Sequence, residues 1–147
     1  MLSGGMANYN VYKCKDDKWI ALGSLEPKFW QGVCVMLGKP DWVPRMMPIP
    51  EMVEALKKDL QKLFLTKTRN EWVQAAEGHD ICLSPILDLE EVEKDAHLNE
   101  REMFFEMEHA DYGKVKGVNQ PFKFSETPAK PSWGAPLMGE DNDMLNE

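Results

Sequence analysis

The apolar pattern of the chain changes its period between residues 23 and 27, and this change restricts the fold more than any other feature. Residues 9–23 (YNVYKCKDDKWIALG) carry apolar side chains on both sides of a polar centre, which predicts a β-hairpin with its turn at that centre. Pro27 then fixes a helical φ and lacks the N–H that the first turn of a helix leaves unpaired. Apolar residues recur at helical spacing as far as Leu37, and Gly38 ends the predicted helix.

Two further helices are predicted downstream. Pro50 begins one whose apolar residues fall on a single face: Val53, Leu56, Leu60, Leu63 and Phe64. Thr68 and Glu71 have the spacing of a capping box, which predicts a short helix that stops near Gly78. The proline-rich residues 39–50 (KPDWVPRMMPIP) predict a surface loop, and residues 80–85 (DICLSP) predict a short buried strand closed by its proline.

The character of the chain changes beyond residue 102. Residues 103–118 (MFFEMEHADYGKVKGV) predict two extended pieces around a Tyr-Gly turn. Residues after 121 are rich in Pro, Gly and acids and contain few apolar side chains, so this tail is predicted to be disordered or to lie on another body of protein. The predicted fold class is α+β: a small antiparallel sheet with three to four packed helices, followed by an extended Pro/Gly-rich tail.

Composition excludes several classes of protein. The net charge of −8 at pH 7 and the absence of a basic stripe argue against nucleic-acid binding. The sequence contains no run of about 20 apolar residues, which is the length that a membrane helix requires. The N-terminus lacks the pattern of a signal peptide. The cysteines and histidines share no metal-binding spacing, so we expect no bound metal. We also expect the cysteines to be reduced thiols, as in a cytoplasmic protein. Trp19, Trp30 and Trp72 are expected in the core.

Glu26 poses the main question about chemistry. It directly precedes Pro27, at the start of the predicted helix. A carboxylate at this place is either a helix cap, favoured by the positive end of the helix dipole, or half of a proton-transfer pair. Taken alone, the residues favour the cap.

Three ordered blocks resemble the C-terminal part of family III CoA-transferases, the family of formyl-CoA transferase, the carnitine and bile-acid CoA-transferases and α-methylacyl-CoA racemase. The blocks are GGMANYNVYKCKDDKWIALGSLEPKFW, CLSPILDLEEVEKDAHLNEREMF, and PFKFSETPAKP followed by APLMGED. The resemblance implies a linker remnant at residues 1–8, the family's small domain at 9–120, and at 121–147 a tail that would return to the large domain. It also implies that the catalytic, Rossmann-like large domain is absent.

The resemblance assigns roles to five residues. The Glu of the matching motif in the racemases hydrogen-bonds the catalytic His, which implies a supporting catalytic role for Glu26. By the same match, Tyr9 and Leu25 would face the acyl group. Gly4 and Gly5 match a glycine loop that closes over the active site, although the shorter glycine run here also fits a plain linker and argues against the oxalate/formate subgroup.

The function implied by this resemblance is that of a small-domain fragment of an acyl-CoA-handling enzyme. The favoured reaction is CoA transfer between carboxylic acids through an aspartyl intermediate in the large domain, with CoA thioesters as substrates and no bound cofactor. The alternatives are an α-methylacyl-CoA racemase-type fragment and a stand-alone, non-catalytic binding or regulatory module. The chain alone is expected to be inactive, and the complete protein is expected to form an interlocked homodimer.

Overall fold

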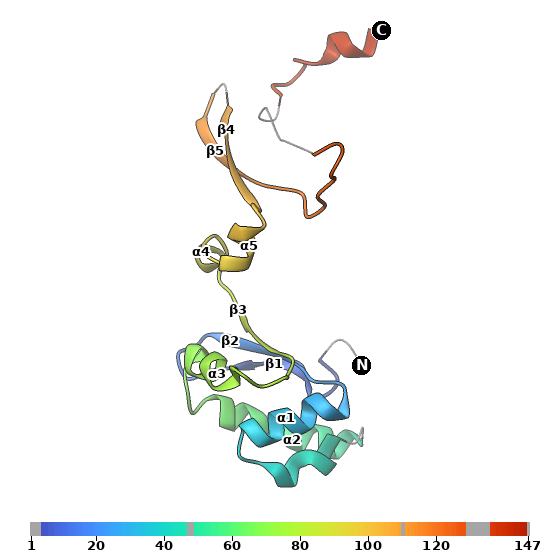
Figure 1. The fold of residues 1–147 in the computed structure, drawn as a ribbon, viewed down its shortest axis with the longest axis vertical. Coiled ribbons are helices and arrows are strands. Elements are labelled where there is room, and N and C mark those ends of the chain that lie inside the picture. Colours follow the sequence, from blue (N-terminus) through green and yellow to red (C-terminus); the bar gives the residue numbers. More distant parts are fainter. Residues whose placement is uncertain (1–3, 47–48, 110, 129–135, 147) are drawn as a thin grey trace. The chain divides into compact units, whose positions relative to one another are not determined.

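The structure is a computed structural model, and it describes residues 4–46, 49–109, 111–128 and 136–146. The chain divides into two compact units, residues 1–87 and 88–147, which we describe separately. Figure 1 shows the elements of both units. They confirm the predicted α+β class, with small antiparallel sheets and several helices.

The first unit is built on a three-stranded antiparallel sheet in the order β1-β2-β3. β1 (Tyr9–Lys13) and β2 (Trp19–Gly23) form the predicted hairpin, with its turn between Cys14 and Lys18. β3 (Leu83–Ile86) pairs with the other side of β2. β2 is therefore the central strand, and its side chains alternate between the core and the opposite face of the sheet.

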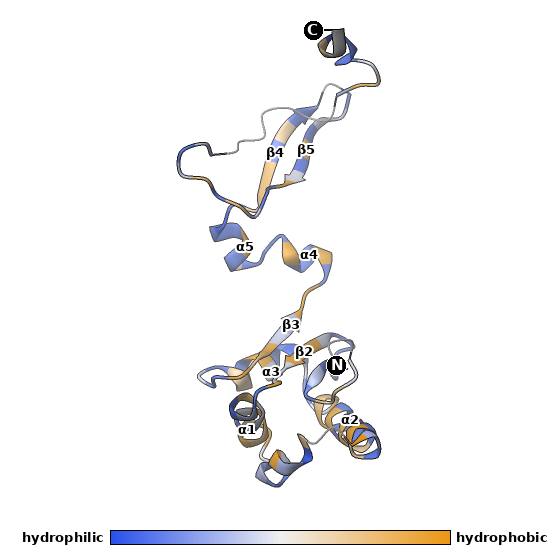
Figure 2. Ribbon diagram, turned by 90° about the vertical axis from the view of Figure 1, so that its right-hand side faces the viewer, coloured by the Kyte–Doolittle hydropathy of each residue, from blue (hydrophilic) through white to orange (hydrophobic). Residues whose placement is uncertain are grey.

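Two helices lie on the same face of this sheet, as both views show (Figures 1 and 2). α1 (Pro27–Met36) begins at the predicted proline, and α2 (Pro50–Phe64) follows the short 3₁₀ helix η1 (Pro40–Met46). The predicted apolar face of α2 is confirmed, because Val53, Leu56, Leu60 and Phe64 are buried. Its opposite face carries the hydrophilic residues seen in Figure 2.

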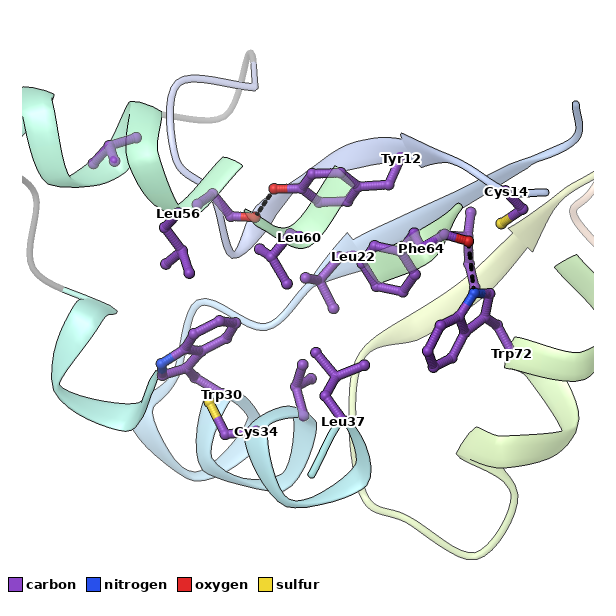
Figure 3. Packing of buried hydrophobic residues seen from close by; sticks show 14 residues of the cluster. Tyr12, Cys14, Leu22, Trp30, Cys34, Leu37, Leu56, Leu60, Phe64 and Trp72 are labelled. Atoms are coloured by element: carbon purple, nitrogen blue, oxygen red, sulfur yellow. Dashed lines mark hydrogen bonds between the residues drawn. The ribbon is translucent and has the colours of Figure 1, made fainter. Parts of the chain in front are cut away.

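The core lies between the sheet and these helices (Figure 3). The Tyr12 ring stacks on Phe64, and Trp72 of α3 (Arg69–Ala76) meets Phe64 edge-on with ring centroids 5.2 Å apart. Trp30 is fully buried, and its indole N–H donates to the carbonyl oxygens of Trp42 and Val43 in η1. This one buried donor therefore has two acceptors, which anchors η1 to α1.

Polar side chains fix the ends of two elements. The capping box predicted for α3 is confirmed, with Thr68 and Glu71 each accepting from the other's backbone N–H. On the edge strand β1, the Gln61 side-chain amide accepts from Lys13 N and donates to Lys13 O. Gln61 thus replaces a neighbouring strand at this position and satisfies backbone groups that a sheet edge leaves open.

The second unit contains α4 (Leu89–Val92), α5 (Ala96–Glu100) and the antiparallel hairpin β4 (Phe104–His109) and β5 (Gly113–Val118), followed by the 3₁₀ helix η2 (Asn142–Asn146). The two predicted extended pieces are confirmed as this hairpin. Gly117 lies opposite Phe105, and a Cβ on Gly117 would stand only 2.5 Å from the Phe105 ring, so a side chain there would displace it. In the tail, residues 121–128 and 136–144 are exposed, and residues 129–135 lie outside the described residues.

Three predictions about this fold are wrong. Trp19 is not in the core: it is 42% exposed, because its place on β2 points it to the side of the sheet away from the helices. The strand expected at residues 80–85 is not buried and does not stop at Pro85: β3 runs to Ile86, and an edge strand tolerates proline. The expected loop at 39–50 contains η1, whose 3₁₀ geometry accepts Pro40 and Pro44.

Candidate functional site

A hollow of about 620 Å³ opens on the face of the sheet that lies away from the core. It is lined by Gly4, Tyr9, Asn10, Val11, Ala21, Leu22, Gly23, Ile81, Cys82, Leu83 and Ser84. Among these described lining residues none has a charged side chain, so the hollow can bind an uncharged, largely apolar group.

Side-chain hydrogen bonds hold the segment before β1 against the sheet. Asn8 is 1% exposed, and its Nδ2 donates to the carbonyl oxygen of Ser24 at 2.8 Å. The buried Tyr12 hydroxyl donates to the carbonyl oxygen of Ala7, as Figure 3 shows for the labelled tyrosine. Burial raises the pKa of Tyr12 well above its usual range, so this hydroxyl stays a donor. The end of this segment, Ala7 and Asn8, is thus packed into the core.

The hollow contains two of the five predicted site residues. Gly4 and Tyr9 both line it. Gly4 has a φ of +76°, and a Cβ there would approach Asn10 Oδ1 to 3.0 Å, so both the backbone and the space at this position favour glycine. Gly5 is exposed and is not among the lining residues. The assignment of substrate contacts to these residues stays a prediction.

Leu25 and Glu26 lie just beyond the end of β2 and do not line the hollow. Leu25 is half-buried. Glu26 is the N-cap residue of α1, and its carbonyl oxygen accepts from Trp30 N at 3.0 Å. Its side chain is exposed and makes no capping hydrogen bond, so the carboxylate is accessible at the positive end of the helix. The catalytic role of Glu26 stays a prediction.

Sequence reasoning missed Gly23, Ala21 and Cys82 as lining residues. The sequence signal for these residues was the alternation of large and small side chains along the predicted strand in residues 20–23 (IALG). The cysteines differ in environment: Cys82 is exposed, whereas burial raises the pKa of Cys14 and of Cys34 to about 11.

The described residues contain neither a candidate metal site nor a candidate membrane span. Within residues 4–46, 49–109, 111–128 and 136–146, no group of three or more His, Cys, Asp or Glu side chains could hold a metal ion. Over the same ranges, every helix is too short or too polar to cross a membrane.

Comparison with known proteins gives a consistent family. Residues 2–142 match the model of CoA-transferase family III. Human α-methylacyl-CoA racemase is 35% identical over 149 aligned positions, which cover 100% of this chain and 38% of that protein. A formyl-CoA:oxalate CoA-transferase from Rhodopseudomonas palustris (strain BisB18) is 29% identical over 97% of this chain and 35% of its own length.

Solved structures show the same fold at low identity. The crystal structure of Rv3272 from Mycobacterium tuberculosis in an orthorhombic form superposes with a TM-score of 0.71 at 21% identity, over 94% of this chain and 40% of that one. A CAIB/BAIF family protein from Brucella suis gives a TM-score of 0.62 at 18% identity, over 97% and 38%. The chain therefore spans little more than a third of the curated relatives described above. With a family match over residues 2–142, the chain belongs to CoA-transferase family III.

Proposed function

We propose that this chain is the small-domain part of an acyl-CoA-handling enzyme, and that residues 121–147 form a tail that contacts a large domain outside the chain. The match of residues 2–142 to CoA-transferase family III carries this proposal. CoA thioesters are the substrate class, because the names of the relatives describe proteins that act on such compounds. The complete protein would act in the cytoplasm as a homodimer.

The favoured reaction is CoA transfer between two carboxylic acids. An aspartate of the large domain would attack the thioester carbonyl, forming an acyl-aspartyl anhydride and releasing the CoA thiolate. The thiolate would then attack the aspartyl carbonyl of this anhydride and release the first carboxylate. The enzyme would thus hold CoA as an aspartyl thioester, ready for transfer to the second acid. Since this nucleophile lies outside the chain, residues such as Tyr9 and Gly4 would contribute binding, and the chain alone should show no turnover.

A racemase is the second candidate, and two observations favour it. Human α-methylacyl-CoA racemase is 35% identical over the whole chain. The Glu26 carboxylate is exposed and makes no capping hydrogen bond, which leaves it available to a histidine of a large domain. A carboxylate so placed would fix the tautomer of the imidazole and stabilise its charged form.

The experiment transplants this chain into two hosts. It replaces the matching segment of human α-methylacyl-CoA racemase, and separately that of the Rhodopseudomonas formyl-CoA:oxalate CoA-transferase. Epimerisation of a chiral 2-methylacyl-CoA is measured in the first chimera, and CoA transfer from formyl-CoA to oxalate in the second. The host that regains activity identifies the branch.

Glu26→Gln in each chimera separates the two reactions. In a racemase the variant should lower kcat, because the imidazole loses the carboxylate that orients it; in a transferase it should leave kcat unchanged. Two folded chimeras that both lack activity would contradict the proposed function. Turnover by the isolated chain in either assay would contradict the placement of the reacting groups outside it.

A further inference from the structure

The hairpin of the second unit, β4 and β5, has one apolar face and one charged face. Residues that lie opposite each other in its register share a face, and the faces alternate along each strand. The residues of one face, which we call the apolar hairpin face, are Phe105, Met107, Val115 and Gly117, with His109 and Gly113 at its turn end. The residues at the centre of the other face are charged and opposed in sign: Glu106, Glu108, Lys114 and Lys116. The hairpin is therefore amphipathic, as a strand pair is when one of its faces packs on a core.

The apolar hairpin face forms one patch across both strands. A Cβ on Gly117 would lie 2.5 Å from Phe105 Cζ and 2.9 Å from Met107 Cε. The Phe105 ring and the Met107 methyl group thus lie over the backbone of Gly117, where a glycine leaves room for them. Val115 stands opposite Met107 on the same face. Phe105, Met107 and Val115 are all half-buried, so the patch stays in part accessible.

The helices of the same unit are attached to the charged face. Lys116 Nζ lies 2.7 Å from the carboxylate of Glu93, which directly follows α4. Asn99 of α5 donates from Nδ2 to the carbonyl oxygen of Glu93 at 2.9 Å. Both helices are thus tied to one residue, and that residue is paired with the charged face. The apolar hairpin face lies on the opposite side of the hairpin.

The described part of the second unit contains no core that could cover this face. In residues 88–109, 111–128 and 136–146 no residue is buried, and every member of the hydrophobic core cluster lies in the first unit. Large apolar side chains of this unit are also exposed, among them Leu89 (84%), Tyr112 (77%) and Phe122 (70%). A two-stranded hairpin alone is at best marginally stable in water, and exposed apolar patches mark interaction sites. The apolar hairpin face therefore has the properties of an interaction surface.

Charge restricts which body can cover this surface. Residues 88–147 contain 15 Asp and Glu against 6 Lys and Arg, a formal charge of −9, whereas residues 1–87 contain 10 against 11, a formal charge of +1. Two copies of the second unit would meet with the same strong negative charge, which opposes the pairing of one apolar hairpin face with another. The complementary partner is a surface with an apolar centre and basic surroundings.

The length of the relatives indicates where such a surface lies. The family match covers residues 2–142 and therefore includes the whole hairpin. The chain spans 38% of human α-methylacyl-CoA racemase and 35% of the Rhodopseudomonas palustris transferase. More than half of each relative thus lies outside the part that resembles this chain, and the proposed function assigns that part to a large domain.

We propose that the apolar hairpin face docks on an apolar patch with a basic rim on the large domain outside this chain. This inference rests on the proposed function, which supplies the large domain. It extends that function, because contact with the large domain then begins at the hairpin, residues 104–118, and not at the tail after residue 121. Burial of Phe105, Met107 and Val115 is favourable in proportion to the apolar area removed from water, and the basic rim pairs with the acidic residues of the second unit.

The test compares hydrogen exchange of the β4 and β5 amides in the full 147-residue chain and in the two chimeras described above. In the isolated chain these amides should exchange fast, because no core protects the hairpin. In the chimeras they should exchange at least about tenfold more slowly, which corresponds to about 1.4 kcal/mol of docking free energy. Amides of the central strand β2 serve as the reference and should exchange alike in all of these proteins.

Val115→Lys and Val118→Lys form a matched pair of variants. They make the same change on the same strand, but Val115 lies on the apolar hairpin face, whereas Val118 is 73% exposed on the other face. In the chimeras, Val115→Lys should remove the protection of the hairpin, because it puts an ammonium group into an apolar contact, and Val118→Lys should preserve it. Salt at about 1 M, where the screening length is about 3 Å, should weaken the protection.

The inference is overturned if the hairpin exchanges at the same rate in the isolated chain and in the chimeras, or if the two variants have the same effect. Protection that does not respond to salt would refute the basic rim. A dimer of the isolated chain in light scattering that Val115→Lys dissociates would assign the face to a second copy instead. The activity of the chimeras is a separate result: an inactive chimera with a protected hairpin refutes only the enzyme assignment, and an active chimera with an unprotected hairpin refutes only the docking.

Discussion

Gly32→Ala gives a sharp test of how closely the loop before β3 packs on α1. Gly32 lies in the interior of α1, and a Cβ built there would stand 2.7 Å from Ile81 Cγ2. Optimal carbon–carbon contact is about 3.5–4.0 Å, so the methyl group overlaps a branched side chain that cannot simply rotate away. Overpacking of this kind costs about 1–3 kcal/mol.

Helix propensity acts in the opposite direction. On an open helix, replacing an interior Gly by Ala stabilises by about 1 kcal/mol. The net expectation for Gly32→Ala is therefore a loss of about 0–2 kcal/mol in the free energy of unfolding. In an Ile81→Ala background the overlap is gone, and the same substitution should stabilise by about 1 kcal/mol. The change in the free energy of unfolding caused by Gly32→Ala is thus expected to have opposite signs in the two backgrounds.

The assay is urea unfolding of all four proteins, followed by the fluorescence of the buried Trp30 and Trp72 of the first unit. The slope of each transition must stay constant, so that midpoints report stability. The double-mutant cycle then gives the coupling between residues 32 and 81 directly. A stabilisation of about 1 kcal/mol by Gly32→Ala in the wild-type background would refute the close approach of Ile81 to the helix.

Three further predictions use the same chain. Trp30→Phe should destabilise by about 1–3 kcal/mol in urea unfolding, because two carbonyl oxygens of η1 lose their indole donor; an unchanged midpoint would contradict those hydrogen bonds. Glu71 accepts hydrogen bonds from the backbone N–H and the hydroxyl of Thr68, which lower the pKa of its carboxyl group. The contribution of Glu71 to folding stability is therefore present above the usual pKa of 4.5 and is lost as the pH falls through the folded-state pKa. The difference in thermal midpoint between wild type and Glu71→Gln should therefore shrink below pH 4.5, and a difference that grows there would show the sign to be wrong. Iodoacetamide at pH 8 should label Cys82 first, because Cys14 and Cys34 are 0% exposed and have raised pKa values; equal labelling in mass spectrometry would refute their burial.

Local sequence determined the elements whose signals are local. Pro27 and Pro50 start their helices, because a proline needs no partner for a missing N–H. Thr68 and Glu71 start α3 through bonds that reach only three residues along the chain. Three ordered blocks of sequence also sufficed to predict the family, which the match over residues 2–142 confirms.

Tertiary structure decided which face of each strand is covered. Trp19 looked like a core residue, yet the register of β2 places it with Gly23 and Ala21 on the outer face. The hollow on the outer face of the sheet depends on residues that are distant in sequence, because Tyr9 and Cys82 both line it only when β1 and β3 pair with β2. Pairing between distant strands leaves no trace in local periodicity, so the sequence predicted the strands while only the assembled sheet defined the site.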